Sequence, residues 1–170
     1  APFEGESGRT FYRNVQQTRH AGLEAAAEWQ PSASFRAAAT YTLAHLTFGP
    51  NDAAPSEALE SNTLPGVPRH QGAAEISGRL GRFDGLVSVQ AQSGLYGDDA
   101  NTARTDGFAW VDAGVGYTVA VSSAKVRPFV RITNVLDAKA IGSVAINARG
   151  GRYFEPAAAR QVYFGVRMAW

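Results

Sequence analysis

The feature that most constrains the fold is an alternation of apolar and polar residues with a period of two. Residues 109–121 show it best, because Val111, Ala113 and Val115 alternate with Asp112 and Gly114. Successive side chains of a strand point to opposite faces, so this pattern predicts β-strands with one apolar and one polar face. Seven segments carry it: residues 21–29, 35–43, 74–80, 87–95, 109–121, 126–132 and 162–170. The alanine runs 25–27 and 37–39 suit a helix by propensity, but their neighbours keep the period of two.

The connections between these segments alternate in length. Residues 30–33, 81–85 and 122–124 are short, whereas residues 49–67, 97–107 and 137–159 are long and rich in Gly, Pro, Asn and Asp. Short turns at one end and long loops at the other are the layout of outer-membrane barrels. We therefore expect an all-β antiparallel meander of about seven long strands, part of a transmembrane β-barrel. A soluble β-sandwich is the alternative, but the charged and small residues of the polar faces favour a watery lumen.

Composition and motifs exclude several classes of protein. The 170 residues suit one domain, and 16 Lys plus Arg against 15 Asp plus Glu argue against a nucleic-acid binder. Without cysteine there is no disulfide, thiol nucleophile or thiolate metal site. No run of 18 apolar residues predicts a membrane helix, whereas a barrel strand needs only about 9–11 alternating residues. No start methionine or signal peptide precedes Ala1, which suggests a mature protein or a fragment.

Enzyme and metal motifs are also missing. The sequence has no Gly-x-Ser-x-Gly, no P-loop and no His-Glu-x-x-His, so we expect no enzyme. His20, His45 and His70 lack the spacing of a helical metal site. We expect them to be solvated or lumen-facing polar groups rather than metal ligands.

The C-terminal third contains stretches that resemble a known family. Residues 132–137, Ile-Thr-Asn-Val-Leu-Asp, resemble the Asn-Leu-Phe-Asp segment of TonB-dependent outer-membrane receptors. Residues 151–156, Gly-Arg-Tyr-Phe-Glu-Pro, followed by Ala159 and Arg160, resemble the loop before the last strand of these receptors. Further stretches resemble the family's segments in the family's order: residues 18–24, 41–43 and 64–70. The departures are Val135 and Leu136 for Leu-Phe, Ala140 where Tyr is common, and a terminal Trp170 for Phe.

This resemblance, to the ferric siderophore type of receptor, implies the identity and partners of the chain. Residues 1–170 look like the C-terminal segment of a 22-stranded barrel, and nothing in them resembles the plug domain or the TonB-contacting segment. The implied function is active uptake of a scarce solute across a Gram-negative outer membrane, energised through TonB. A ferric siderophore is the expected solute; cobalamin, other chelates and carbohydrates stay open.

The resemblance also implies what the chain contacts. We expect no cofactor in this segment, since a ferric chelate would be the transported ligand of the parent receptor. The expected partners are the lipid bilayer, the missing barrel strands and plug, and the TonB complex through that plug, with no nucleic acid. The open sheet edges could drive self-association. The alternative is a self-contained small outer-membrane barrel with a structural or adhesive role. It needs an eighth strand from residues 1–14, where no convincing alternation exists.

Three groups of residues are candidates for function. The long loops offer Arg and aromatic side chains suited to anionic ferric chelates: Arg104, Arg149, Arg152, Tyr153 and Phe154. For residues 152–156, we favour the alternative that the loop is fixed by its own packing. The resemblance implies a barrel-assembly signal in the last strand: Phe164, Val166, Met168 and Trp170. The alternative there is a plain lipid-facing strand with an interfacial anchor.

The charges and aromatics of the strands also predict two surfaces. Charged residues on the polar faces are predicted to line the lumen: Glu24, Glu28, Arg36, Glu75, Arg79, Asp112, Arg127, Arg131 and Arg167. Trp29, Phe83 and Trp170 fall at short-turn ends, where an aromatic girdle belongs. Packing in a soluble core is the alternative for these three rings.

Overall fold

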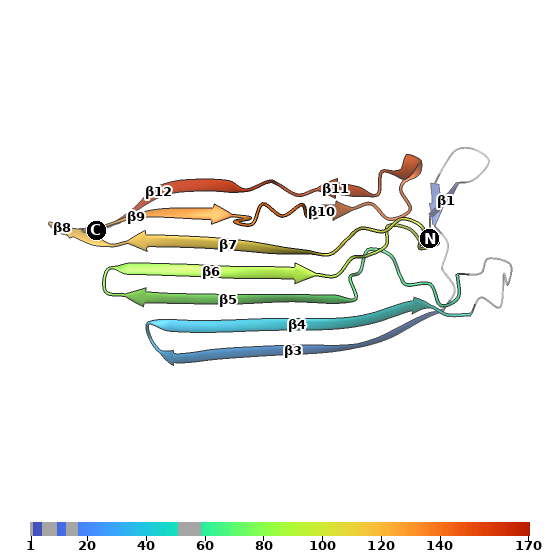
Figure 1. Cartoon of the computed structure of the whole chain (residues 1–170), viewed down its shortest axis with the longest axis horizontal. Helices are drawn as coiled ribbons and strands as arrows, with labels where there is room; N and C mark the ends of the chain where they lie inside the picture. Colours follow the sequence, from blue (N-terminus) through green and yellow to red (C-terminus); the bar gives the residue numbers. More distant parts are fainter. Residues whose placement is uncertain (1, 5–9, 13–16, 51–58) are drawn as a thin grey trace.

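The computed structural model of the chain describes residues 2–4, 10–12, 17–50 and 59–170. Seven of its strands form one antiparallel meander in the spatial order β12-β9-β7-β6-β5-β4-β3, so that sequence neighbours lie side by side (Figure 1). These strands are β3 (Thr18–Ser32), β4 (Phe35–Phe48), β5 (His70–Leu80), β6 (Phe83–Gln92), β7 (Phe108–Tyr117), β9 (Ala124–Thr133) and β12 (Gln161–Ala169). The predicted class and meander are confirmed. The sheet is not closed within the described residues, since β3 and β12 are its edges.

Several strand boundaries differ from the prediction, and those of the segments 109–121 and 87–95 have a clear physical reason. The segment 109–121 is two strands, because β7 ends at Tyr117 and β8 (Val119–Val121) continues beside β9 after Thr118. The segment 87–95 ends at Gln92, and Leu95 lies buried in the following loop. The chain leaves the strand there because Gly94 approaches another part of the loop: a Cβ on Gly94 would lie 2.2 Å from the carbonyl oxygen of Thr105.

Two short hairpins complete the strands. β1 (Pro2–Glu4) pairs with β2 (Thr10–Tyr12) in a separate two-stranded sheet. β10 (Ile141–Val144) pairs with β11 (Phe154–Pro156) inside the last long connection, which also holds the 3-10 turn η1 (Arg149–Gly151). No helix in the described part of the chain is long and apolar enough to cross a membrane.

The turns separate the two ends of the sheet as predicted. Residues 33–34, 81–82 and 122–123 form tight turns at one end, and Gly81 and Ser122 adopt positive φ angles of 61° and 55° there. Residues 49–69, 93–107 and 134–160 connect the strands at the other end (Figure 1). We call these the short-turn end and the long-loop end.

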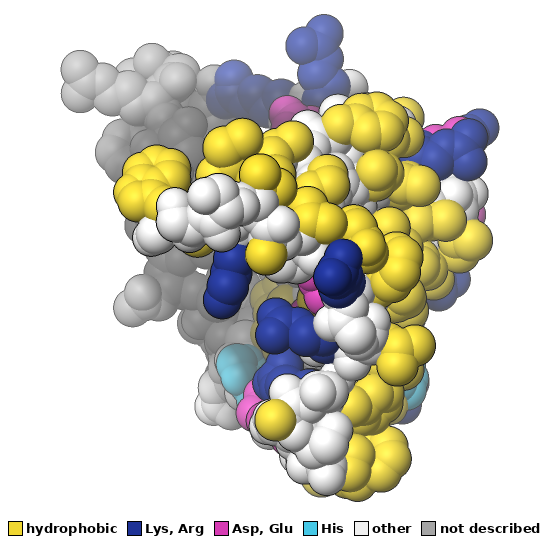
Figure 2. Space-filling view, turned by 90° about the vertical axis from the view of Figure 1, so that its left-hand side faces the viewer, with side chains coloured by type: hydrophobic (Ala, Val, Ile, Leu, Met, Phe, Trp, Pro, Cys, Tyr) yellow, Lys and Arg dark blue, Asp and Glu magenta, His cyan; other side chains and the backbone are white. Residues whose placement is uncertain are grey.

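In the described part of the chain, the seven-strand sheet has no apolar core beneath it. The buried apolar residues of the described part are Phe48, Leu95 and Ala140, all at the long-loop end. Large apolar side chains along the strands are exposed instead, with Leu80 at 84% and Phe164 at 78%. Figure 2 shows apolar side chains along one side of the sheet, and Arg, Lys and acidic side chains toward the other. A continuous exposed apolar face of this extent requires an apolar medium or partner.

Candidate solute-facing wall and outer loops

The strand register gathers the predicted lumen charges on one face, which we call the polar face. Across the sheet, Glu75 pairs with Ser88, and Ser88 pairs with Asp112. Arg79 pairs with Asp84 in the same way. Because residues directly opposite share a face, all nine predicted charges share the polar face.

Ion pairs join the strands across the polar face. The Arg36 Nε donates to Glu28 Oε1 at 2.8 Å, and Arg36 Nη1 lies 3.4 Å from Glu75 Oε1, so one guanidinium connects β3, β4 and β5. Arg131 Nη2 lies 3.3 Å from Asp112 Oδ2, which connects β9 to β7. These carboxylates are therefore neutralised in place rather than left to face the solvent alone.

A further ion pair contains a residue that the sequence analysis missed. Arg127 on β9 donates from Nε to Asp84 Oδ1 at 2.7 Å, and its Nη2 contacts Asp84 Oδ2. Asp84 had been placed in the turn 81–85, yet β6 begins at Phe83 and puts this carboxylate on the polar face. The signal that could have found it is the two-residue spacing from Leu86 and Ser88, which continues the alternation of β6.

Glycines make room for these long side chains. Arg127 reaches β6 across Gly116 of β7, where a Cβ would lie 2.3 Å from Arg127 Nη2 and 2.5 Å from its Nε. The ring of Phe129 lies over Gly165 of β12 in the same way, with a Cβ position 2.3 Å from the ring. Arg127 also stands 5.6 Å from the centroid of Phe129. Four strands, β12, β9, β7 and β6, are thus connected by two side chains.

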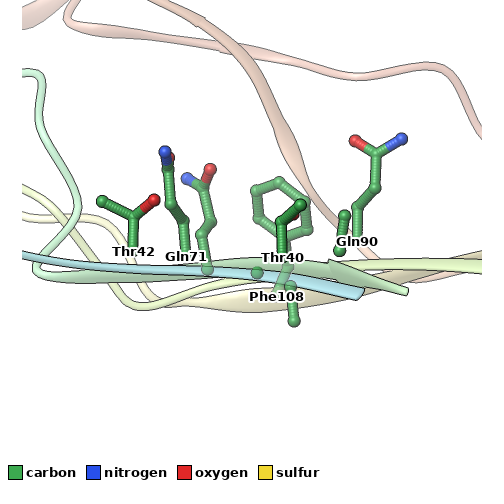
Figure 3. A pocket seen from close by; sticks show the side chains of 9 residues that line it. Thr40, Thr42, Gln71, Gln90 and Phe108 are labelled. Atoms are coloured by element: carbon green, nitrogen blue, oxygen red, sulfur yellow. The ribbon is translucent and has the colours of Figure 1, made fainter. Parts of the chain in front are cut away.

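Toward the long-loop end the polar face carries a pocket without charged lining residues. This pocket of about 200 Å³ is lined by Thr40, Thr42, Gln71, Gly72, Ala73, Gln90, Ala91, Gln92 and Phe108. Figure 3 shows the labelled Thr, Gln and Phe side chains rising from the same side of the sheet. Gln71 was missed because the predicted strand began at residue 74, whereas β5 begins at His70.

The segment 132–137, which resembles the family's Asn-Leu-Phe-Asp segment, is held in place by a buried asparagine. Asn134 is fully buried with φ 51°, and its Oδ1 accepts from the Ala138 backbone N–H at 2.8 Å while its Nδ2 donates to the Ala138 carbonyl at 3.0 Å. Its own backbone N–H donates to Asp112 Oδ1 at 3.0 Å. Asp137 accepts from the backbone N–H of Arg160 at 3.0 Å. This segment therefore links the ends of β7, β9 and β12.

The three long connections form one cluster, which we call the loop cluster. The Asn101 side chain donates to the carbonyl oxygen of Thr63 and accepts from its N–H, both at 2.8 Å. Asn62 Nδ2 donates to the carbonyl of Asp99 at 3.0 Å. The Asn147 side chain accepts from the Asp99 N–H at 3.0 Å and donates to its Oδ2 at 2.9 Å. Amide side chains therefore bind the three loops to one another.

Asp98 holds the central turn of the loop cluster. Burial alone would raise the pKa of its carboxyl, but donors from the Thr102 hydroxyl and from the backbone N–H groups of Ala103 and Thr102 outweigh burial and lower the pKa. The N–H groups lie 3.0 Å (Ala103) and 2.8 Å (Thr102) from Oδ1. The carboxylate thus shapes its own loop.

The predicted loop ligands occupy different positions. The guanidinium of Arg104 lies 5.9 Å from the ring centroid of Tyr96. Tyr153 and Phe154 are half-buried against Gly97, where a Cβ would lie 2.8 Å from Tyr153 Cβ. Two other candidates, Arg149 and Arg152, are exposed at η1. The packing of Tyr153 and Phe154 is the arrangement expected of a loop fixed by its own contacts; ligand binding by any of the five stays a prediction.

The predicted assembly signal and aromatic girdle lie on the apolar face. Phe164, Val166 and Met168 are exposed on the edge strand β12, and Trp170 follows that strand with 96% of its surface exposed. Two aromatic pairs lie at the short-turn end, with ring centroids 5.4 Å apart for Trp29 and Phe35 and 4.7 Å for Phe83 and Tyr117. The assembly role itself stays a prediction.

The histidines form no metal centre. No group of three potential metal ligands occurs among the described residues. His70 Nδ1 lies 2.8 Å from the Tyr41 hydroxyl. The register of β4 and β5 puts His45 and His70 on the apolar face, so the lumen-facing alternative is wrong for these two. Both are exposed, and the solvated role stays a prediction.

Comparison with known proteins agrees with this geometry. The family model described as TonB dependent receptor-like, beta-barrel matches residues 2–135. The chain therefore belongs to the TonB-dependent receptor β-barrel family, of which it is an open barrel segment.

Solved structures show the same fold. The siderophore receptor PiuA from Acinetobacter baumannii matches with a TM-score of 0.74 and 18% identity, over 98% of this chain and 23% of that chain. The ferric citrate transporter FecA matches with a TM-score of 0.71 and 20% identity, over 89% and 24%. The ferric yersiniabactin uptake receptor FyuA from Yersinia pestis matches with a TM-score of 0.64 and 19% identity, over 89% and 23%. The chain thus spans about a quarter of the length of each receptor.

Proposed function

We propose that this chain is the C-terminal barrel portion of an outer-membrane receptor that imports a ferric siderophore with energy supplied through TonB. The observation that carries the proposal is a single-layer sheet with two opposite faces. One face is apolar and exposed, as lipid contact requires, and the other holds ion-paired charges and neutral polar groups, as a watery lumen requires. The named receptors PiuA, FecA and FyuA support the solute class.

The proposal assigns roles to the parts of this chain. The apolar face contacts the outer-membrane bilayer, with the aromatic pairs at one headgroup level. The edges β3 and β12 pair with the remaining barrel strands, and the plug of the same receptor occupies the lumen and contacts TonB. The last strand directs barrel assembly. The loop cluster lies outside the cell, where Arg104, Arg149, Arg152, Tyr153 and Phe154 are the candidate chelate contacts. No catalysis and no resident cofactor are part of this proposal.

The self-contained small barrel gains no support from the described residues. It requires residues 1–14 to supply a strand that joins the sheet. The strands β1 and β2 instead pair with each other, and neither is part of the seven-strand meander.

Two measurements test the proposal. An antibody to this segment should detect, in the source outer membrane, a polypeptide several times larger than 18.0 kDa. Deletion of that polypeptide should abolish uptake of a radio-iron chelate, and deletion of TonB should abolish the same uptake. A band at 18.0 kDa, or uptake that ignores TonB, would overturn the transport proposal.

A further inference from the structure

The apolar face of the meander carries basic side chains at one place. The strand register puts Arg19 of β3, His45 of β4 and His70 of β5 on this face. Within the seven described strands of the meander, no other Arg, Lys, His, Asp or Glu lies on the apolar face, since every carboxylate of those strands lies on the polar face. We call these three residues the Arg-His cluster. It can therefore meet an anion without a carboxylate beside it on the same strands.

The members of the Arg-His cluster are neighbours on adjacent strands (Figure 1). Arg19 lies opposite Thr47, two residues along β4 from His45. Leu43, two residues from His45 in the other direction, lies opposite His70. Each step from Arg19 to His45 to His70 is thus a diagonal of about 7–8 Å, which long and aromatic side chains can span. All three side chains are exposed, so one headgroup can contact them together.

The Arg-His cluster lies at the height of a headgroup layer. The pair of Trp29 and Phe35 marks the other layer, at the short-turn end. Ten positions along β3 separate Arg19 from Trp29, and ten along β4 separate His45 from Phe35. With a rise of about 3.3 Å per residue and a tilt of about 35–45°, ten positions span about 25 Å of height, the thickness of the apolar band of an outer-membrane barrel. The cluster therefore falls in the leaflet next to the long loops.

The side chains of the Arg-His cluster have donors available for a ligand. The Tyr41 hydroxyl lies 2.8 Å from His70 Nδ1, and when this hydroxyl donates to Nδ1, the proton of the neutral ring is on Nε2. Among the described residues, neither the Arg19 guanidinium nor the His45 ring has a hydrogen-bond or ion-pair partner. Guanidinium and imidazole N–H groups are suited to phosphate oxygens.

An apolar groove of about 410 Å³ begins beside the cluster, at Tyr41 and His70. Its floor consists of small residues on two neighbouring strands, Gly72 and Ala74 of β5 and Ala91 of β6. The groove runs from the headgroup layer toward the middle of the apolar band. An acyl chain lying in it would keep contact with apolar groups along its length.

We infer that the Arg-His cluster binds the phosphate of an outer-leaflet lipid and that the groove beside it holds one acyl chain of that lipid. An unpaired cation inside the apolar band costs free energy, whereas at the border of the band it can pair with an anionic headgroup. The inference rests on the part of the proposed function that places the apolar face against the outer-membrane bilayer. It adds a specific lipid as a partner.

Native mass spectrometry of the receptor as it is encoded, folded in detergent, tests this inference with two probes. The probes are a diphosphorylated lipid A and the same lipid without its phosphates. The wild type should bind the phosphorylated probe about tenfold more tightly, because only this probe accepts charge-assisted hydrogen bonds from the cluster. Arg19→Gln should reduce that preference, and the triple variant Arg19→Gln, His45→Gln, His70→Gln should abolish it. Ala91→Leu fills the groove and should weaken the binding of both probes.

The matched control is Arg69→Gln. Arg69 is exposed directly before His70 but lies opposite Ala44 on the polar face, so this variant removes the same charge at the same height from the other side of the sheet. It should keep the preference for phosphate within about twofold of the wild type. Heat-modifiable migration checks that each variant is folded.

Three results would overturn the inference: a wild type without preference for phosphate, an equal loss of preference in Arg19→Gln and Arg69→Gln, or Ala91→Leu binding both probes as the wild type does. Uptake of the radio-iron chelate separates these failures from failure of the transport proposal. If uptake depends on TonB while the phosphate preference is absent, the inference alone falls. If the preference is present while uptake ignores TonB, the transport proposal falls and the lipid site stands.

Discussion

Gly116→Ala is the most direct test of how the polar face holds the strands together. The new Cβ would lie 2.3–2.5 Å from the Arg127 guanidinium, which must then move away from Asp84. Charge-assisted hydrogen bonds are worth about 1.5–3 kcal/mol, and exposure reduces that value. The two side chains are 26% and 25% exposed, so we take about 1–2 kcal/mol for the lost pair. Alanine in place of strand glycine returns about 0.5–1 kcal/mol, which leaves a net loss of up to about 1.5 kcal/mol.

The matched control is Gly114→Ala, two residues away on the same face of β7. Its Cβ would meet the Val130 carbonyl oxygen at 3.5 Å, an ordinary contact, so this variant should gain about 0.5 kcal/mol. The assay is equilibrium urea unfolding of the refolded receptor in lipid vesicles. In an Arg127→Ala background, Gly116→Ala should become neutral or stabilising, because the side chain it displaces is gone. An unchanged loss in that background would refute the role given to Arg127.

Four further predictions follow from the loops, the last strand and the sheet edges. Asn134→Ala should destabilise the receptor by about 1–3 kcal/mol, measured by urea unfolding, because the fully buried Asn134 side chain and the half-buried Ala138 N–H and C=O lose their hydrogen bonds. The lowered pKa of Asp98 means that its stabilisation is present above the ordinary carboxyl pKa and is lost as the pH falls through the folded-state pKa. The hydrogen-exchange protection factors of its two amide donors, which are rates corrected for the pH dependence of intrinsic exchange, should therefore fall on acidification, and Asp98→Asn should abolish that dependence. Trp170→Ala should reduce heat-modifiable, folded receptor in outer-membrane fractions more than Trp29→Ala does, and equal effects would contradict a terminal signal. The isolated 170-residue chain should aggregate in buffer without detergent through its two open edges, and a monodisperse monomer in light scattering would contradict this.

The sequence predicted the sheet well because the alternation is long and local. Each strand of the meander carries its own two-residue period. The number of strands, the face of each side chain and the strand order could therefore be predicted without knowing contacts between residues far apart in the sequence. The boundary of the segment 87–95 was wrong because Gly94 meets Thr105 of its own loop, a contact between residues that no local pattern relates. Asp84 was missed for a related reason, since turn-forming Gly81 and Gly85 flank it.

The candidate sites were less predictable than the fold. The loop cluster depends on Asn62, Asn101 and Asn147, which come from three connections and meet only in the folded chain. Asparagine is common in turns, so its presence in these loops did not predict hydrogen bonds between loops. The arginine and aromatic candidates were chosen by ligand chemistry alone, and the packing of Tyr153 against Gly97 was not visible in that choice.

The loop cluster also has an immunological consequence. Its outer surface is assembled from residues 59–66, 95–105 and 143–154, so an antibody that binds it would recognise a conformational epitope rather than a linear peptide. An insertion between Asp98 and Ala103 would disturb the neighbouring loops as well, because Asp99 and Asn101 carry the bonds to both. A sequence change at one of these bonded positions is therefore constrained by the other two loops.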